Sequence, residues 1–202
     1  MSSEPGDTRT RILEATWRLM EQRYGQGVSM SDIAEAAGIS RQAVYLHFAS
    51  RTELMIATTN YVNDVKGLDE RLRQFQAATN GSELLQTCVE IWGNFIPEIY
   101  GLAKALMMTR DTDAATAAAW NGCMSGLRDV CRETIEALAR EGILAPEWSV
   151  DDAIEMFLTI ISIHNWEQLT MECGWSTAQY TDRMKALLQR TFIAQEHTTH
   201  PD

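Results

Sequence analysis

The most informative stretch of this 202-residue sequence is SMSDIAEAAGISRQAVYLHFASRTEL, residues 29–54. Ser29 and Ser40 each stand before a short run suited to a helix, where a serine side chain can cap the first turn. Gly38 lies between the two runs and tolerates the positive φ that a tight turn needs. The spacing therefore predicts two short helices joined by a turn, a helix-turn-helix over residues 29–48.

The second of these helices presents polar side chains that suit DNA. Its length of about one and a half turns fits the roughly 12 Å wide major groove. Its outward residues offer groups that can meet base edges or phosphates: Arg41, Gln42, Tyr45 and His47. Two alternatives stay open, because His47 can instead pack against the first helix, and the Tyr45 ring can pack while its hydroxyl meets a phosphate.

The distribution of charge limits where nucleic acid can bind. The net charge is −11, so the chain as a whole repels a polyanion. Residues 1–53 hold six arginines against seven acids, whereas residues 54–202 hold eleven basic residues against twenty-one acids. The near-neutral N-terminal quarter is therefore the part of the surface expected to meet DNA.

The whole chain shows helical spacing of its apolar residues. They recur every three or four positions, and no strand-like alternation runs for six residues or more. We expect an all-α fold with about nine helices, over residues 7–24, 29–37, 40–47, 52–77, 82–97, 99–110, 111–140, 149–173 and 177–195. Ser82, Asp111 and Ser149 are expected to cap helices, and Pro97 to interrupt or end one.

Composition argues against several classes of protein. The four cysteines are widely spaced without a C-x-x-C pair, which favours free thiols in a reducing cytoplasm over disulfides or a zinc site. No apolar run approaches 18 residues and the first residues lack a basic, apolar leader, so we expect neither a membrane span nor a secretory signal. His197 and His200 are expected to be solvated. We therefore expect a cytoplasmic protein without a metal or other cofactor.

Residues 29–54 resemble the DNA-binding module of TetR-type transcriptional regulators. The positions that match the family pattern are Ser29, Ile33, Ala34, Ala37, Gly38, Tyr45, Phe48, Arg51 and Leu54. The resemblance covers roughly residues 8–55, and the plan of about nine helices agrees with it. The sequence departs from the family where Gly25 follows Tyr24 instead of a glycine preceding the aromatic residue. Gln42 stands where a small residue is common, and Arg51 replaces the usual lysine.

The resemblance implies a division of the chain and a set of DNA contacts. A three-helix helix-turn-helix domain over residues 6–66 would precede a helical ligand-binding and dimerisation domain over residues 67–195, with a disordered tail over residues 196–202. The implied DNA contacts are Ser29, Ser31, Arg41, Gln42, Ala43, Tyr45, His47 and Arg51. Arg41, Gln42 and Ala43 would face the bases, and Arg51 would clamp a phosphate from the start of the fourth helix.

In this family the C-terminal part encloses a small-molecule pocket, and its last helices pair with those of a twofold mate. The candidates for the pocket, with ordinary core packing as the alternative, are Trp92, Phe95, Tyr100, Met107, Met108, Trp120, Met124, Phe157 and His164. The candidates for the dimer interface are Ile154, Phe157, Ile161, Met184, Leu187, Leu188 and Thr191. For His164 and its neighbour Asn165, an interface role and satisfied burial in the core are further alternatives.

These features predict a ligand-responsive, homodimeric repressor that a small apolar or aromatic molecule releases from a palindromic double-stranded DNA operator. One alternative is a DNA-binding protein of the same fold that acts through protein partners. Another is a small-molecule enzyme on a helical scaffold. Against an enzyme, the sequence shows no set of nucleophile, base and orienting group, no suggestively spaced carboxylate pair and no Gly-rich phosphate loop.

Overall fold

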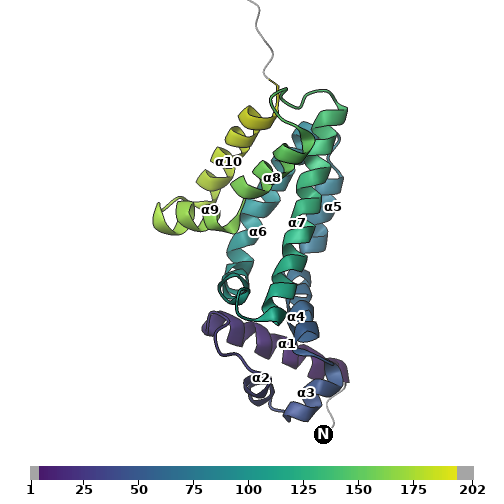
Figure 1. Cartoon of the computed structure of the whole chain (residues 1–202), viewed down its shortest axis with the longest axis vertical. Helices are drawn as coiled ribbons and strands as arrows, with labels where there is room; N and C mark the ends of the chain where they lie inside the picture. The colour runs from purple at the N-terminus through teal and green to yellow at the C-terminus, as the bar shows by residue number, and fades with distance from the viewer. Residues whose placement is uncertain (1–4, 195–202) are drawn as a thin grey trace, which may run out of the picture. The chain divides into compact units, whose positions relative to one another are not determined.

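The computed structural model describes residues 5–194, and this part of the chain is almost entirely helical (Figure 1). Its elements are α1 (Pro5–Gln22), α2 (Met30–Ala36), α3 (Arg41–His47), α4 (Arg51–Val65), α5 (Leu68–Gln76), α6 (Gly81–Thr109), α7 (Ala114–Arg140), α8 (Val150–Ile160), α9 (Ile163–Glu167), a π-helical segment (Gln168–Glu172) and α10 (Thr177–Phe192). The expected all-α fold is confirmed. Pairing of extended backbone is limited, within the described residues, to an isolated antiparallel bridge between Leu144 and Ile193.

Contacts between residues group the chain into two compact units. The N-terminal unit holds the chain up to Asp69 together with Glu98–Ser125. The C-terminal unit holds Glu70–Pro97 and the chain from Gly126 onward. The two long helices are divided between the units: α6 passes from one to the other after Pro97, and α7 after Ser125. The division expected between residues 66 and 67 therefore stays a prediction, and the expected tail over residues 196–202 lies outside the described residues.

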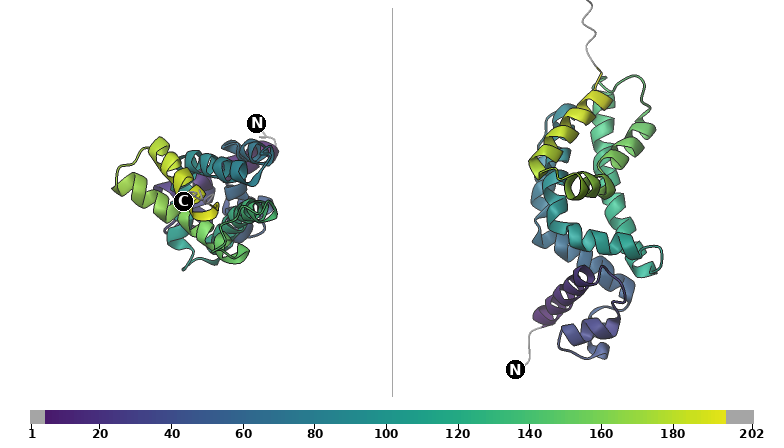
Figure 2. Two further views of the ribbon diagram at one scale, coloured as in Figure 1. Left: turned by 90° about the horizontal axis from the view of Figure 1, so that it is seen from above. Right: turned by 90° about the vertical axis from the view of Figure 1, so that its left-hand side faces the viewer.

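In the N-terminal unit, α1 packs against α2 and α4, and α2 packs against α3 (Figure 2). Helices α2 and α3 have the bounds that their caps predict. Ser29 accepts a hydrogen bond from the Asp32 N–H, and Ser40 accepts one from the Ala43 N–H. Gly38 adopts the positive φ of +68° expected at the turn. The predicted helix-turn-helix is thus present.

The expected helix over residues 52–77 is wrong at its middle. Helix α4 ends at Val65, and α5 begins only at Leu68. Gly67 between them has a φ of +69°, and the Lys66 and Gly67 N–H groups close the last turn on the carbonyls of Val62 and Asp64. A glycine in the left-handed region is a common helix end. The helical spacing of apolar residues continues on both sides of Gly67, so a helix end was not expected there.

Two shorter expected helices, over residues 82–97 and 99–110, are instead the single helix α6. Pro97 lies inside it and does not end it. Proline removes one backbone hydrogen bond from a helix, and the remaining bonds of this 29-residue helix maintain it. Its cap is also corrected: Asn80, and not Ser82, accepts from the Glu83 N–H at 2.9 Å.

The expected cap of the following helix, Asp111, is wrong by two residues. Helix α7 begins at Ala114, and the Asp113 carboxylate accepts from the Ala115 N–H at 2.9 Å. Asp113 therefore satisfies one of the free N–H groups of the first turn. Either aspartate could serve from sequence alone.

The expected helix over residues 149–173 breaks after Ile161, although its cap Ser149 is confirmed. Ser162 adopts an extended ψ and caps the short helix α9. The Asn165 side-chain amide donates to the carbonyls of Thr159 and Ile160, so it satisfies the end of α8. His164 is exposed, and the interpretation of it as a buried core histidine is wrong.

The C-terminal unit has its own apolar core. It contains side chains from α6, α7, α8 and α10 that solvent does not reach: Leu85, Ile96, Cys131, Ile135, Leu138, Phe157, Tyr180, Leu188 and Phe192. Phe192 ends α10 against two aromatic rings, with centroid distances of 5.4 Å to Trp148 and 5.8 Å to Phe157. Gly93 on α6 faces Thr181 on α10 so closely that a Cβ built on the glycine would lie 2.5 Å from the threonine hydroxyl oxygen.

This close approach predicts that Gly93→Ala destabilises the chain, by about 1–3 kcal/mol, because the buried Thr181 side chain must move. Gly126→Ala on α7 is the matched control, since a Cβ there meets nothing within 4 Å. It should raise stability by about 0.4–1 kcal/mol. Urea unfolding followed by circular dichroism measures both. A Gly93→Ala variant as stable as the Gly126→Ala variant would contradict the packing.

Candidate nucleic-acid interface

Helix α3 turns one face to the interior and the opposite face to solvent. Val44 and Phe48 are fully buried. On the other side Arg41, Gln42 and Tyr45 are exposed, as predicted. Ala43 and His47 are half-buried. The polar groups expected to meet DNA therefore lie on the accessible side of the helix.

Leu46 is a member of this face that the sequence interpretation missed. Its side chain is 83% exposed, the highest exposure of any large apolar residue described. Leu46 stands two positions from both Val44 and Phe48, which places it on the opposite side of the helix. An exposed apolar group on a DNA-facing helix suits the methyl group of thymine. The signal was available in the spacing, but Leu46 was not assigned to either face of the helix from the sequence.

Arg41 lies at the N-terminal end of α3, above the Tyr45 ring, with the guanidinium carbon 5.7 Å from the ring centroid. The other arginines of residues 1–53 contact the protein itself. Arg11 donates to the Ala37 carbonyl at 2.5 Å, and Arg9 lies over the Phe48 ring at 4.5 Å. Arg41 is consequently the arginine of this quarter that is best placed for base contact.

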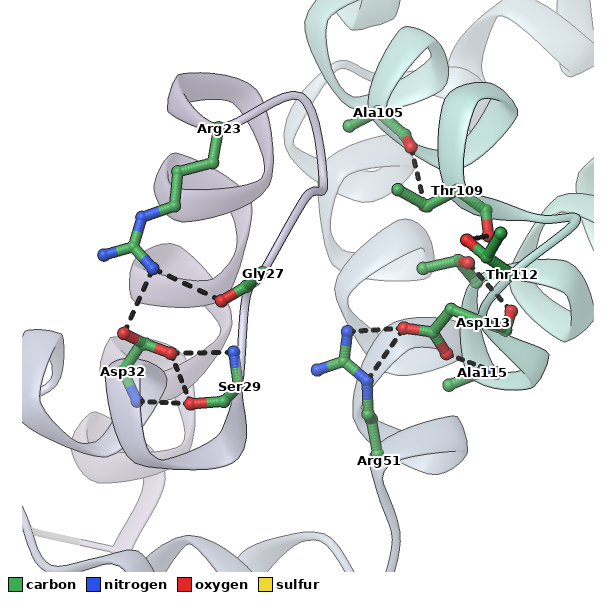
Figure 3. Close-up of polar contacts among 11 residues, drawn as sticks. Arg23, Gly27, Ser29, Asp32, Arg51, Ala105, Thr109, Thr112, Asp113 and Ala115 are labelled. Atoms are coloured by element: carbon green, nitrogen blue, oxygen red, sulfur yellow. Dashed lines mark hydrogen bonds and ion pairs between the residues drawn. The ribbon is translucent and has the colours of Figure 1, made fainter.

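The start of α2 is a closed network of hydrogen bonds (Figure 3). The Ser29 hydroxyl donates to the Asp32 carboxylate and accepts from the Asp32 N–H at 3.2 Å. Arg23 pairs with the same carboxylate at 3.0 Å. The bonds from the Ser29 hydroxyl and N–H, together with that from Arg23, hold the pKa of Asp32 well below its usual value. The Ser29 hydroxyl hydrogen is thus already in use, whereas Ser31 is exposed.

Arg51, the predicted phosphate clamp, is bound to an acid in this structure. Its Nη2 and Nε lie 2.7 and 3.1 Å from Oδ2 of Asp113, in the turn between α6 and α7 (Figure 3). Both side chains are about a quarter exposed. Burial alone would raise the pKa of Asp113, but the bonds from Arg51 and the Ala115 N–H hold it below its usual value. The pair joins residues 62 positions apart, which no local pattern could show.

A hollow of about 610 Å³ opens beside these groups. Its lining comes from the loop after α1, the first residues of α2, α3 and α4, the last residue of α6 and the turn between α6 and α7: Gly25, Gln26, Gly27, Val28, Ser29, Met30, Ser31, Arg41, Arg51, Thr109, Thr112 and Asp113. The hollow brings together four of the eight predicted DNA contacts. Gln42, Ala43, Tyr45 and His47 do not line it.

The residues predicted to line an effector pocket are spread over both compact units, and none lines this hollow. Phe95, Trp120 and Phe157 are buried, whereas Met108 and His164 are exposed. The half-buried members are Trp92, Tyr100, Met107 and Met124. Trp92 donates from its indole nitrogen to the Ile161 carbonyl, so its orientation is fixed within the C-terminal unit. The effector pocket stays a prediction.

Most residues predicted for a dimer interface are buried within the chain itself. Ile154, Phe157, Ile161, Met184 and Leu188 are all at most 6% exposed. Leu187 is 39% exposed and Thr191 half-buried, so these two are the members that a partner subunit can reach in this structure. Met156 on α8, at 40% exposure, is an accessible apolar residue that the prediction omitted.

Residues 5–194 offer neither a metal cluster nor a membrane span. No group of three His, Cys, Asp or Glu side chains in this range is placed to hold a metal ion. No helix of this part is long and apolar enough to cross a membrane. Its cysteines are free thiols, and burial raises the pKa of Cys88 to about 12 and that of Cys123 to about 11.

Comparisons with known proteins agree on the N-terminal module. Residues 12–58 match the family model "Bacterial regulatory proteins, tetR family". The HTH-type transcriptional regulator TtgR of Pseudomonas putida is 36% identical over 61 residues, 30% of this chain and 29% of that protein. The nucleoid occlusion factor SlmA of a Marinomonas species is 28% identical over 64 residues, 32% of each. The chain thus spans about a third of the length of these curated relatives.

Solved structures extend the likeness in fold to nearly the whole chain. The transcriptional regulator FadR from Bacillus subtilis, in complex with stearoyl-CoA, superposes with a TM-score of 0.73. The match covers 90% of this chain and 98% of that one, at 14% sequence identity. At this identity the likeness shows a shared fold.

The hydrogen-bonded start of α2 predicts that Ser29→Ala lowers the free energy of unfolding by about 0.5–2 kcal/mol, because a helix N-cap is lost. Ser31→Ala is the matched control within the same helix and should change it by less than about 0.5 kcal/mol. Thermal and urea unfolding measure both. Equal effects of the two substitutions would contradict the capping role.

Proposed function

We propose that this chain, which carries a TetR-type helix-turn-helix domain at residues 12–58, is a transcriptional regulator that binds operator DNA as a homodimer. The observation that carries the proposal is α3, a short helix with a polar, accessible face in a near-neutral module of an otherwise acidic chain. The proposal places α3 in the major groove, with Arg41, Gln42 and Leu46 at base edges.

The homodimer follows from how such modules read DNA. One α3 helix contacts only a few base pairs, and two copies separated by about 34–36 Å can read two half-sites of a palindrome. A symmetric pairing needs a self-complementary surface. Accessible apolar side chains on α8 and α10, such as Met156 and Leu187, supply part of one.

We further propose that a small apolar or aromatic molecule binds the helical C-terminal part and releases the protein from DNA, as in a repressor acting in the cytoplasm. Support comes from the fold shared with FadR of Bacillus subtilis, whose structure contains stearoyl-CoA. The half-buried residues Met107 and Met124, which belong to one compact unit, are candidates for its lining, because methionine adapts to irregular ligands. A coupling free energy of about 1–3 kcal/mol would suffice to change DNA affinity 5- to 150-fold.

A second candidate function is a DNA-binding protein that acts through protein partners. The observation that favours it is the likeness of residues in this module to the nucleoid occlusion factor SlmA. An effector that releases the DNA would favour the repressor, whereas capture of a specific protein partner on DNA would favour the alternative. These relatives are named as regulators or as an occlusion factor, so an enzyme is the least supported candidate.

The first experiment is a gel shift of the purified protein on the DNA upstream of its own gene, at two salt concentrations. A specific, salt-sensitive complex supports the proposal. Mass spectrometry of the denatured protein then shows whether a co-purified molecule holds it in the released state. Absence of a specific complex after removal of any such molecule, on this DNA and in selection from random sequences, would contradict the proposal.

The position of Arg41 predicts that Arg41→Ala weakens operator binding by about 1–3 kcal/mol and relaxes the preference at one base pair. Arg140→Ala, an exposed arginine at the end of α7, is the control for loss of one positive charge. Fluorescence anisotropy with operator and with scrambled DNA measures both. Equal weakening on the two DNAs would assign Arg41 to a phosphate instead of a base.

A further inference from the structure

We propose that Asp113 holds Arg51 back from DNA phosphates, so that opening this ion pair is a step in DNA binding. This inference rests on the proposed function and adds a regulatory contact to it. The two residues come from α4 and from the turn between α6 and α7, and both belong to the N-terminal unit.

The geometry shows that Asp113 occupies the donors a phosphate would use. Nε and Nη2 of Arg51 both point to Oδ2 of Asp113, at 3.1 and 2.7 Å. Oδ1 of the same carboxylate accepts from the Ala115 N–H at the start of α7. Asp113 is therefore fixed in place by α7, and the long Arg51 side chain is the member of the pair that can move.

The closed pair leaves Arg51 incompletely satisfied. Its Nη1 is buried and has no hydrogen-bond partner. A buried donor without a partner is costly, so the closed conformation is less favourable than the ion pair alone suggests. The pair is also partly exposed, which limits its strength. A phosphate with several acceptor oxygens can therefore compete for the guanidinium.

The hollow shows where a released Arg51 would act. Arg51 lines it together with Ser31 and Arg41, which are exposed and belong to the start of α2 and of α3. A phosphate at the mouth of the hollow would meet these two residues and the freed guanidinium. Charge-assisted hydrogen bonds from arginine to phosphate are among the stronger ones in proteins.

A competing interpretation predicts the opposite effect of Asp113 on DNA affinity. Asp113 could orient Arg51 so that its other edge meets the phosphate, in which case loss of the carboxylate charge would weaken binding. The buried position of Nη1 argues against it, because a ligand could not reach that nitrogen while the pair is closed.

The test is Asp113→Asn against Asp111→Asn. Both remove one negative charge from the same turn, but Asp111 is exposed and lies 3.7 Å from Arg110. Asparagine caps a helix about as well as aspartate, so α7 should keep its start. We expect the Asp113→Asn variant to bind operator DNA about threefold to tenfold more tightly than the Asp111→Asn variant, because the ion pair no longer has to open. The salt slope should be the same for both variants, because Arg51 reaches a phosphate in both complexes. Adding Arg51→Ala should abolish the gain.

The outcomes separate this inference from the proposed function. If the unsubstituted protein does not bind DNA specifically, both the proposed function and this inference are wrong. If it binds and the Asp113→Asn variant matches the Asp111→Asn variant, the regulatory contact is wrong and the function stands. Weaker binding by the Asp113→Asn variant, with unchanged thermal unfolding, would instead assign Asp113 the orienting role and overturn the inference.

Discussion

Helices α2 and α3 are seven residues long, and helices of that length are not stable alone in water. The helix-turn-helix therefore depends on burial of a few side chains that their neighbours share. Ile33 on α2, Val44 on α3 and Phe48 just after it are fully buried. Each helix also has a serine cap. A chain that lost this small core would lose the rigid presentation of the α3 face.

The arginines of the N-terminal module serve this same requirement. Arg11 and Arg18 donate to the carbonyls of Ala37 and Ala36 at the end of α2, where positive charge also complements the helix dipole. Arg23 pairs with Asp32 at the start of that helix. Most arginines of the module thus stabilise its fold. The positive charge that can contact DNA comes from Arg41, and from Arg51 when its ion pair with Asp113 is open.

Local signals were enough to predict the helix-turn-helix, because the caps Ser29 and Ser40 and the turn residue Gly38 lie within a few positions of the groups they satisfy. The TetR-type resemblance found in the same residues is confirmed by the family match. Prediction failed where packing between distant segments decided the outcome. Asp113, and not Asp111, lies at the start of α7 and pairs with Arg51, which is remote in sequence. At Pro97 the error was different, because the remaining hydrogen bonds of the long helix α6 maintain it through the proline.

The boundary between the two compact units is crossed by the chain at three points, after Asp69, Pro97 and Ser125. Each point lies inside a helix, in α5, α6 and α7 respectively. Boundaries between compact units usually fall in exposed, flexible linkers. Here a protease that needs an extended backbone finds no such segment, and neither unit can be excised by one cut. The units should therefore unfold together, because melting either one removes hydrogen-bonded turns from helices that the other also uses.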